Sequence, residues 1–248
     1  MIMGVYNTAF NIGGALGLAW GVPEEMLGWR LATAIGGGIG LLLAVENLLV
    51  VLREKDATIT HKNALDLERP VIILGLSTAG FWGANYASGS LMASYAQVAY
   101  GAPPSVAGIF TSVFFVGSAL GGLAAMSFDK TKNKTRFIFT FILLTGASYV
   151  LIMFGLYSMV LTMAFNGFLS SIAFSAYYAH TSSISKNFSL ALSTVNFLNM
   201  IVGMWISPLF TWIMSISISA LPFALAFVSV APLILWLLIR NPSLPRRG

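Results

Sequence analysis

The sequence predicts an all-helical protein that crosses a membrane several times. Of its 248 residues, 57% are hydrophobic and only 8% are charged, whereas soluble domains carry about 25% charged residues. The mean hydropathy of +0.85 arises from apolar runs distributed along the whole chain. A chain of this composition needs lipid as its main solvent.

Each predicted element is an apolar run long enough to span lipid. A bilayer core of about 30 Å requires roughly 20 apolar residues in one helix. Eight segments meet this requirement, at residues 3–21, 29–52, 70–99, 105–127, 136–156, 158–180, 188–214 and 219–240. The third exceeds the minimum and contains four glycines, so we expect it to tilt, bend or project from the membrane.

The connections between these segments are polar or turn-forming. In chain order they are "GVPEEMLGWR", the loop 53–69, "YGAPPS", a lysine-rich cluster, a tight turn near Tyr157, the region of Lys186, and "SISISA". The loop 53–69, "REKDATITHKNALDLER", is the one strongly polar stretch, and it divides two helices from six. We interpret this loop as a linker.

Basic residues predict the orientation of the spans. With eight spans, twelve basic residues fall on one side of the membrane and Arg30 falls on the other. The twelve are Arg53, Lys55, Lys62, Arg69, Lys130, Lys132, Lys134, Arg136, Lys186, Arg240, Arg246 and Arg247. Because cytoplasmic loops are enriched in Lys and Arg, this side is predicted to be cytoplasmic, with both chain termini on it. We expect a multi-pass protein of the cell or cytoplasmic membrane.

The same sequence argues against several classes of function. It contains no cysteine, and the predicted spans contain no paired carboxylates, nucleophile–base pair or phosphate-binding loop. We therefore expect no enzyme activity, no catalytic residue, no metal site and no cofactor. The net charge of +5 is divided among short clusters between apolar spans, so nucleic acid is not an expected partner.

A weak internal repeat relates the first and seventh segments. Shifting the chain by 190 residues aligns Gly13, Gly17 and Leu18 with Gly203, Ser207 and Pro208. Asn7 and Asn11 then have loose counterparts in Asn196 and Asn199. Both segments show small residues four apart, the spacing that allows close packing of membrane helices. Repeats of this length are typical of transporters built from two related halves.

Two stretches resemble the major facilitator superfamily of transporters. "NIGGALGLAWG", then "LGWRLATAIGGGIGLLLA" and a charged loop, resemble that family's fifth and sixth helices and central loop. Gly13, Gly17 and Gly21 match the glycine motif of the fifth helix, with Leu18 in place of its proline. "GSALGGLAAMSFDKTKNKTR" similarly resembles the end of the eighth helix and its basic loop. The matching positions there are Gly121, Gly122 and the cluster Lys130 to Arg136, and Asp129 with Lys130 stands for a displaced acidic–basic pair.

The resemblance implies that this sequence corresponds to helices five to twelve of a twelve-helix fold. Residues 1–52 would be the last two helices of the N-terminal half, 53–69 the cytoplasmic linker, 70–240 the complete C-terminal half and 241–248 a cytoplasmic tail. Helices one to four would be missing. The implied activity is secondary active transport of a small solute by alternating access. The alternative is a non-transporting membrane remnant or an assembly partner.

The resemblance and the composition together define the expected partners. They are the lipid bilayer, a small-molecule substrate, and a second chain if one supplies the missing helices.

Glu46 is a candidate for proton coupling. It lies within the apolar run "LLLAVENLLVVLR", and a carboxylate at the bilayer centre costs about 2.5–3.5 kcal/mol on insertion scales. A structural alternative is that Glu46, two turns before Arg53, extends toward water or pairs with a basic group.

The candidate substrate-binding residues lie in two other spans. "GFWGANYASG" places Trp82, Asn85 and Tyr86 on successive turns, and aromatic walls with a few polar groups suit a small-molecule cavity. "FNGFLSS" adds Asn166 and Ser170. Packing against neighbouring helices is the alternative for both groups. For Asn7 and Asn11, which share one helix face, the two interpretations are likewise helix packing and ligand binding.

Overall fold

The described chain is helical throughout, with short connections. The computed structural model describes residues 26–53, 68–126, 133–185 and 187–237, and the single residues 12 and 131. Within these ranges it forms α-helices and 3₁₀-helices and no β-strand, so the predicted all-helical class is confirmed for them. The chain divides into two units, one of which is Leu16–Ala64. The two units are described separately.

The described part of the smaller unit is one long helix, α3, Trp29–Arg53. It coincides with the predicted span 29–52. Gly28 precedes it with a φ of 76°, a conformation that glycine adopts without steric cost. Most described side chains of α3 are exposed, Glu46 among them.

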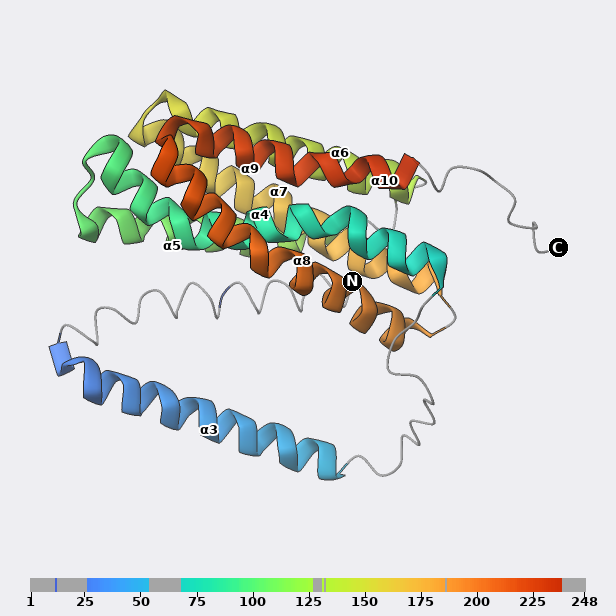
Figure 1. Cartoon of the computed structure of the whole chain (residues 1–248). Helices are drawn as coiled ribbons and strands as arrows, with labels where there is room; N and C mark the ends of the chain where they lie inside the picture. The colour runs from blue at the N-terminus through green and yellow to red at the C-terminus, as the bar shows by residue number, and fades with distance from the viewer. Residues whose placement is uncertain are drawn as a thin grey trace. The chain divides into compact units, whose positions relative to one another are not determined.

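The larger unit is a bundle whose helices run alongside one another (Figure 1). Its long helices are α4 (Arg69–Tyr100), α5 (Pro104–Ala124), α6 (Lys134–Ser148), α7 (Leu156–Ile184) and α8 (Phe188–Ile216). A 3₁₀-helix, η2 (Tyr149–Phe154), continues α6. The last span consists of η3 (Ile218–Ala220), α9 (Leu221–Val230), η4 (Ala231–Leu233) and α10 (Ile234–Leu237). These bounds lie within four residues of the predicted ones, whereas the predicted span 3–21 lies outside the described residues except for Ile12.

Local sequence explains where several helices begin and end. Pro70 and Pro104 stand in the first turns of α4 and α5, where a missing N–H costs no hydrogen bond. Gly101 ends α4 in the left-handed region, with a φ of 64°. The side chains of Asn133 and Asn187 cap α6 and α8 by accepting hydrogen bonds from backbone N–H groups three residues later.

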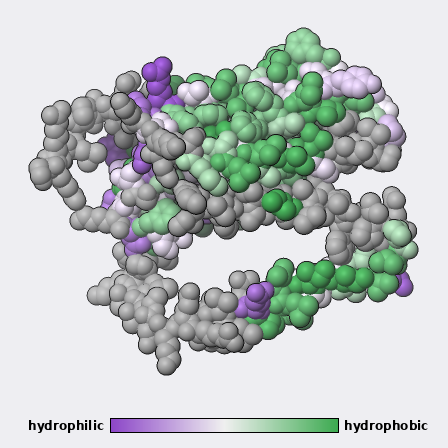
Figure 2. All heavy atoms as spheres, turned by 180° about the vertical axis from the view of Figure 1, so that it is seen from behind, coloured by the Kyte–Doolittle hydropathy of each residue, from purple (hydrophilic) through white to green (hydrophobic). Residues whose placement is uncertain are grey.

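Four helical stretches are long and apolar enough to cross a membrane, judged by length and composition. They are Lys134–Phe154, Leu156–Thr181, Phe188–Ile216 and Ile218–Trp236. This finding agrees with a membrane protein. In Figure 2, the coloured residues on this face of the bundle are mostly hydrophobic, and strongly hydrophilic residues lie toward one end of the bundle.

The longest helix of the bundle, α4, is not among those four. Half of its 32 residues are buried against other helices, and many of these are small or polar. A helix enclosed by protein can carry Ser, Thr, Asn and Gly because its neighbours, not lipid, satisfy them. The Ser, Thr, Asn and Gly residues on the buried side of α4 therefore account for part of its low hydropathy.

The helix contacts follow a repeated pattern. The two most extensive contacts join α4 to α8 and α5 to α7, and further contacts join α4 to α9 and α6 to α7. In chain order, the last three helices correspond to the first three: α7 to α4, α8 to α5 and α9 to α6. Under this correspondence the α4·α8 contact matches the α7·α5 contact, and the α4·α9 contact matches the α7·α6 contact. The first three helices of the bundle and the last three thus pack in corresponding ways.

Glycines allow the closest helix contacts. A Cβ atom added to Gly83 of α4 would lie 2.9 Å from the Cα of Gly203 in α8. On α5, a Cβ added to Gly117 or Gly121 would collide with the backbone of Ala164 or Phe168 in α7. Glycines four apart at such crossings are typical of membrane helix pairs.

The 3₁₀-helix η2 depends on side chains for part of its hydrogen bonding. The Tyr100 hydroxyl, at the end of α4, donates to the carbonyl oxygen of Ile152. The Ser158 hydroxyl, in the first turn of α7, donates to the carbonyl oxygen of Leu151 at 2.6 Å. Carbonyl groups left without regular α-helical partners are in this way satisfied by neighbouring helices.

Candidate functional site

The second half of α4 carries an exposed polar face. Tyr86, Ser90 and Gln97 are all exposed, and their spacing of four and then seven residues places them on one side of the helix. Tyr86 is 62% exposed. Between Tyr86 and Ser90, a Cβ atom added to Gly89 would meet no other atom within 4 Å, so the surface there is open. We call Tyr86, Gly89, Ser90 and Gln97 the α4 polar face.

The indole ring of Trp82 stacks on one face of the Tyr86 ring. The two rings are stacked, with centroids 5.4 Å apart and planes within 5° of parallel. Trp82 itself packs over Gly203 of α8, where a Cβ atom would come within 2.6 Å of the indole Cζ3. The absence of a side chain at Gly203 therefore makes room for the indole ring, and the indole ring fixes the phenol ring.

Asn85 does not share this exposed face. It is 5% exposed, and its side-chain amide donates to the carbonyl oxygen of Phe81 at 3.1 Å. Its Oδ1 atom is buried and has no hydrogen-bond partner in the described structure. Adjacent residues of an α-helix point about 100° apart, so Asn85 faces the interior while Tyr86 faces outward.

Asn166 and Ser170 are also buried, on α7. The Asn166 amide donates to the carbonyl oxygen of Thr145 at 3.2 Å and to the Ser148 hydroxyl at 3.0 Å, which ties α7 to α6. Ser170 donates to the carbonyl oxygen of Gly167 in its own helix. Because these hydrogen bonds are made within the bundle, they indicate a role in helix packing for Asn166 and Ser170. The structure therefore brings Trp82 and Tyr86 together and places Asn85, Asn166 and Ser170 away from the exposed face.

Hydrogen bonds also link η2 to α4. The Tyr149 hydroxyl, at the start of η2, donates to the Ser88 hydroxyl at 3.3 Å. Ser88 in turn donates to the backbone carbonyl of Asn85 at 2.8 Å. These two bonds join η2 to α4.

A second polar junction joins three helices. Thr78 of α4 donates to Asn199 Oδ1 at 3.1 Å, and Asn199 of α8 donates to the Tyr177 hydroxyl of α7 at 3.1 Å. Nearby, the Tyr178 hydroxyl donates to Asn196 Oδ1 at 2.6 Å. Such bonds are worth about 0.6 kcal/mol each on average in membrane proteins. Their partners are internal, so this junction holds helices together.

The other predicted positions are scattered. Gly121 and Gly122 are buried near the end of α5, Arg136 is exposed in the first turn of α6, and Pro208 is exposed within α8. Seven of the predicted residues lie outside the described residues: Asn7, Asn11, Gly13, Gly17, Gly21, Asp129 and Lys130. Ser90 and Gln97 were not predicted. A polar residue inside an otherwise apolar helix is the signal by which they could have been found.

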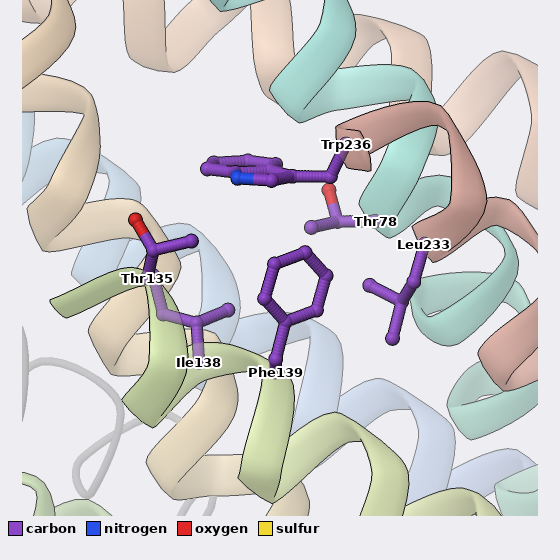
Figure 3. Close-up of a pocket in the computed structure, with 6 residues that line it drawn as sticks. All are labelled: Thr78, Thr135, Ile138, Phe139, Leu233 and Trp236. Carbon is purple, nitrogen blue, oxygen red and sulfur yellow. The ribbon is translucent and has the colours of Figure 1, made fainter. Parts of the chain in front are cut away.

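The concave regions of the bundle do not provide a better site. The cleft in Figure 3, between α4, α6 and the last span, is closed by the rings of Phe139 and Trp236 and has no room for a water molecule. A larger groove of about 430 Å³ lies between α5 and α7. Only apolar residues line it, namely Val113, Val116, Gly117, Leu120, Leu161, Ala164, Phe165 and Phe168. Such a surface suits lipid.

Neither metal-site geometry nor sequence comparison assigns a function. Among the described residues, no group of three or more His, Asp or Glu side chains could hold a metal ion. No protein-family model matches the chain, and no curated protein is detectably similar to it. The geometry of the bundle therefore carries the functional argument.

Proposed function

We propose that this protein takes part in secondary active transport of a small solute across a membrane. The observation that carries the proposal is the α4 polar face, because it includes an exposed phenol near the middle of a long helix. Tyr86 lies about 26 Å from the start of α4, close to the middle of a helix about 48 Å long. In a membrane-spanning bundle this position falls within the hydrocarbon region.

An exposed phenol at that depth does not suit contact with lipid. A hydroxyl group without a hydrogen-bond partner costs roughly 2–7 kcal/mol in an apolar medium. The exposed hydroxyl and amide groups of Tyr86, Ser90 and Gln97 therefore favour a water-filled path or a polar solute on this side of α4. Substrate sites of transporters lie near the bilayer midplane, the depth at which we place Tyr86.

The repeated packing supports the same proposal. Six-helix halves of major facilitator transporters consist of two inverted repeats of three helices. The correspondence between α4·α8 and α7·α5, and between α4·α9 and α7·α6, is the contact pattern that such a repeat would produce. We propose that the bundle is one such half, that α3 belongs to the other half, and that the chain has about eight spans.

The described basic residues favour the proposed orientation. Arg69, Lys134 and Arg136 lie in the first turns of α4 and α6, two helices separated by one antiparallel neighbour, so these first turns share one end of the bundle. We propose that this end is cytoplasmic. The loop before α6 would then help to stabilise one end state of alternating access.

Uptake into proteoliposomes tests the proposal. Purified full-length chain would be reconstituted, and uptake of a panel of labelled sugars, nucleosides, amino acids and organic cations would be compared with protein-free liposomes. We expect saturable uptake of at least one class. A folded, monodisperse protein that moves none of them would contradict transport and favour the non-transporting alternative.

A further inference from the structure

The stacked pair Trp82–Tyr86 has the properties of a preformed ring-binding surface. Gly203 leaves space for the indole, and the indole holds the phenol within 5° of parallel. One face of the phenol is thus covered by Trp82, while the side chain as a whole remains 62% exposed. A ring whose orientation is already fixed loses little conformational entropy when a ligand stacks on it.

The described residues of α4 and α8 around this surface are uncharged. In α4 the single charged residue is Arg69, at the first position of the helix. Among the described residues the Tyr86 hydroxyl has no hydrogen-bond partner, and the Ser90 hydroxyl donates back to the carbonyl of Ala87 at 3.0 Å, leaving its oxygen able to accept. The surface therefore offers an aromatic face, a donor and acceptors, without a formal charge to attract an ion.

Distances along the helix limit the size of the ligand. Ser90 lies about 6 Å along the axis from Tyr86, and the open position at Gly89 lies between them. Gln97 is about 16 Å away along the axis, too far to contact a single ring placed on Tyr86. One six-membered ring with polar substituents spans the distance from Tyr86 to Ser90.

We propose that the Trp82–Tyr86 pair binds the solute, and that this solute is an uncharged ring carrying hydroxyl or amino groups. The inference rests on the proposed transport function and specifies its substrate class. A pyranose and a neutral heteroaromatic ring share this chemistry, because either can place an apolar face on the phenol and direct polar groups toward Ser90.

Cysteine protection tests the proposal directly, because the chain contains no cysteine. Ser90→Cys places a thiol beside the aromatic pair, and Leu120→Cys, at a 57% exposed position in the apolar α5–α7 groove, is the matched control. In proteoliposomes, a charged methanethiosulfonate reagent should modify S90C and leave L120C unmodified, because the reagent does not enter lipid. Methyl glucoside or cytosine should slow the S90C reaction, and the acyclic polyol sorbitol should not.

A second set of variants tests whether the aromatic pair is responsible for the protection. Adding Tyr86→Ala to S90C should raise the protecting concentration about tenfold. Tyr86→Leu, which keeps apolar volume, should do the same if Tyr86→Ala misfolds. Tyr157→Ala, which removes an 88% exposed tyrosine outside the α4 polar face, should leave the concentration unchanged.

The possible outcomes separate the two proposals. An unreactive S90C would mean that lipid or another helix covers the surface, and it would overturn the ring-binding role. Equal protection by sorbitol, no protection by either ring, or protection that persists without Tyr86 would also overturn it. Protection by methyl glucoside alone or by cytosine alone would identify the ring type. Ring protection without flux would reject transport and retain the binding surface, whereas flux without ring protection would reject the ring-binding role alone.

Discussion

Replacing Gly117 by alanine should destabilise the bundle, whereas the same replacement at Gly89 should stabilise it. Both glycines lie inside helices, at α5 and α4 respectively. Alanine favours the helix over glycine by about 1 kcal/mol at each position. Their surroundings differ, because Gly117 is in contact with α7 and Gly89 has open space around it.

The structure sets the size of the expected difference. A Cβ atom at Gly117 would lie 2.9 Å from the carbonyl carbon and 3.2 Å from the Cα of Ala164, and closer still to its carbonyl oxygen. These are backbone atoms that cannot rotate away, so α5 and α7 must separate. Overpacking of this kind costs typically 1–3 kcal/mol or more. After subtraction of the helix-propensity gain, G117A should be destabilised by up to about 2 kcal/mol, and G89A stabilised by about 0.5–1 kcal/mol.

Equilibrium unfolding of the purified protein in mixed micelles, followed by far-ultraviolet circular dichroism, would measure both changes. The free energy of unfolding should fall for G117A and rise for G89A. If both variants shift in the same direction by similar amounts, the close α5·α7 contact described above is wrong.

Three further predictions test other parts of the structure. Asn199→Ala should lower the free energy of unfolding by about 1–2 kcal/mol, because it removes bonds to Thr78 and Tyr177; a double-mutant cycle with Tyr177→Phe that shows no coupling would contradict the junction. Tyr100→Phe should increase amide hydrogen exchange in η2, since it removes the donor to Ile152, and unchanged exchange measured by mass spectrometry would count against this support. Glu46→Gln should leave any pH dependence of uptake unchanged, because this exposed carboxylate can extend toward water; a flattened pH profile would instead assign proton coupling to Glu46.

Helix positions in the bundle could be predicted from the sequence because their signals are local. Both ends of α4 and the start of α5 follow from Pro70, Gly101 and Pro104, each of which favours a helix boundary at its own position. Apolar length alone located the remaining helices. The finding that four stretches are long and apolar enough to cross a membrane rests on the same length and composition.

Which side chains of a helix are buried and which are exposed could not be predicted in the same way. Asn85 and Tyr86 are neighbours in the sequence, yet one is buried and the other exposed. In a soluble helix, polar residues mark the outer face, but in lipid both faces can be apolar and buried polar groups are satisfied by other helices. Which side of α4 faces inward depends on the contacts with α8, α5 and α9, and these are not encoded in α4 alone.

The change from α-helix to 3₁₀-helix at Tyr149 also increases the length of the helical stretch Lys134–Phe154. A 3₁₀-helix rises about 2.0 Å per residue against about 1.5 Å for an α-helix, so the six residues of η2 add about 3 Å to the span. The 21 residues Lys134–Phe154 therefore extend about 34 Å and exceed a hydrocarbon core of about 30 Å even with a modest tilt. Tyr100 and Ser158 donate hydrogen bonds to this segment, and a return of η2 to α-helical geometry would shorten the stretch by about 3 Å.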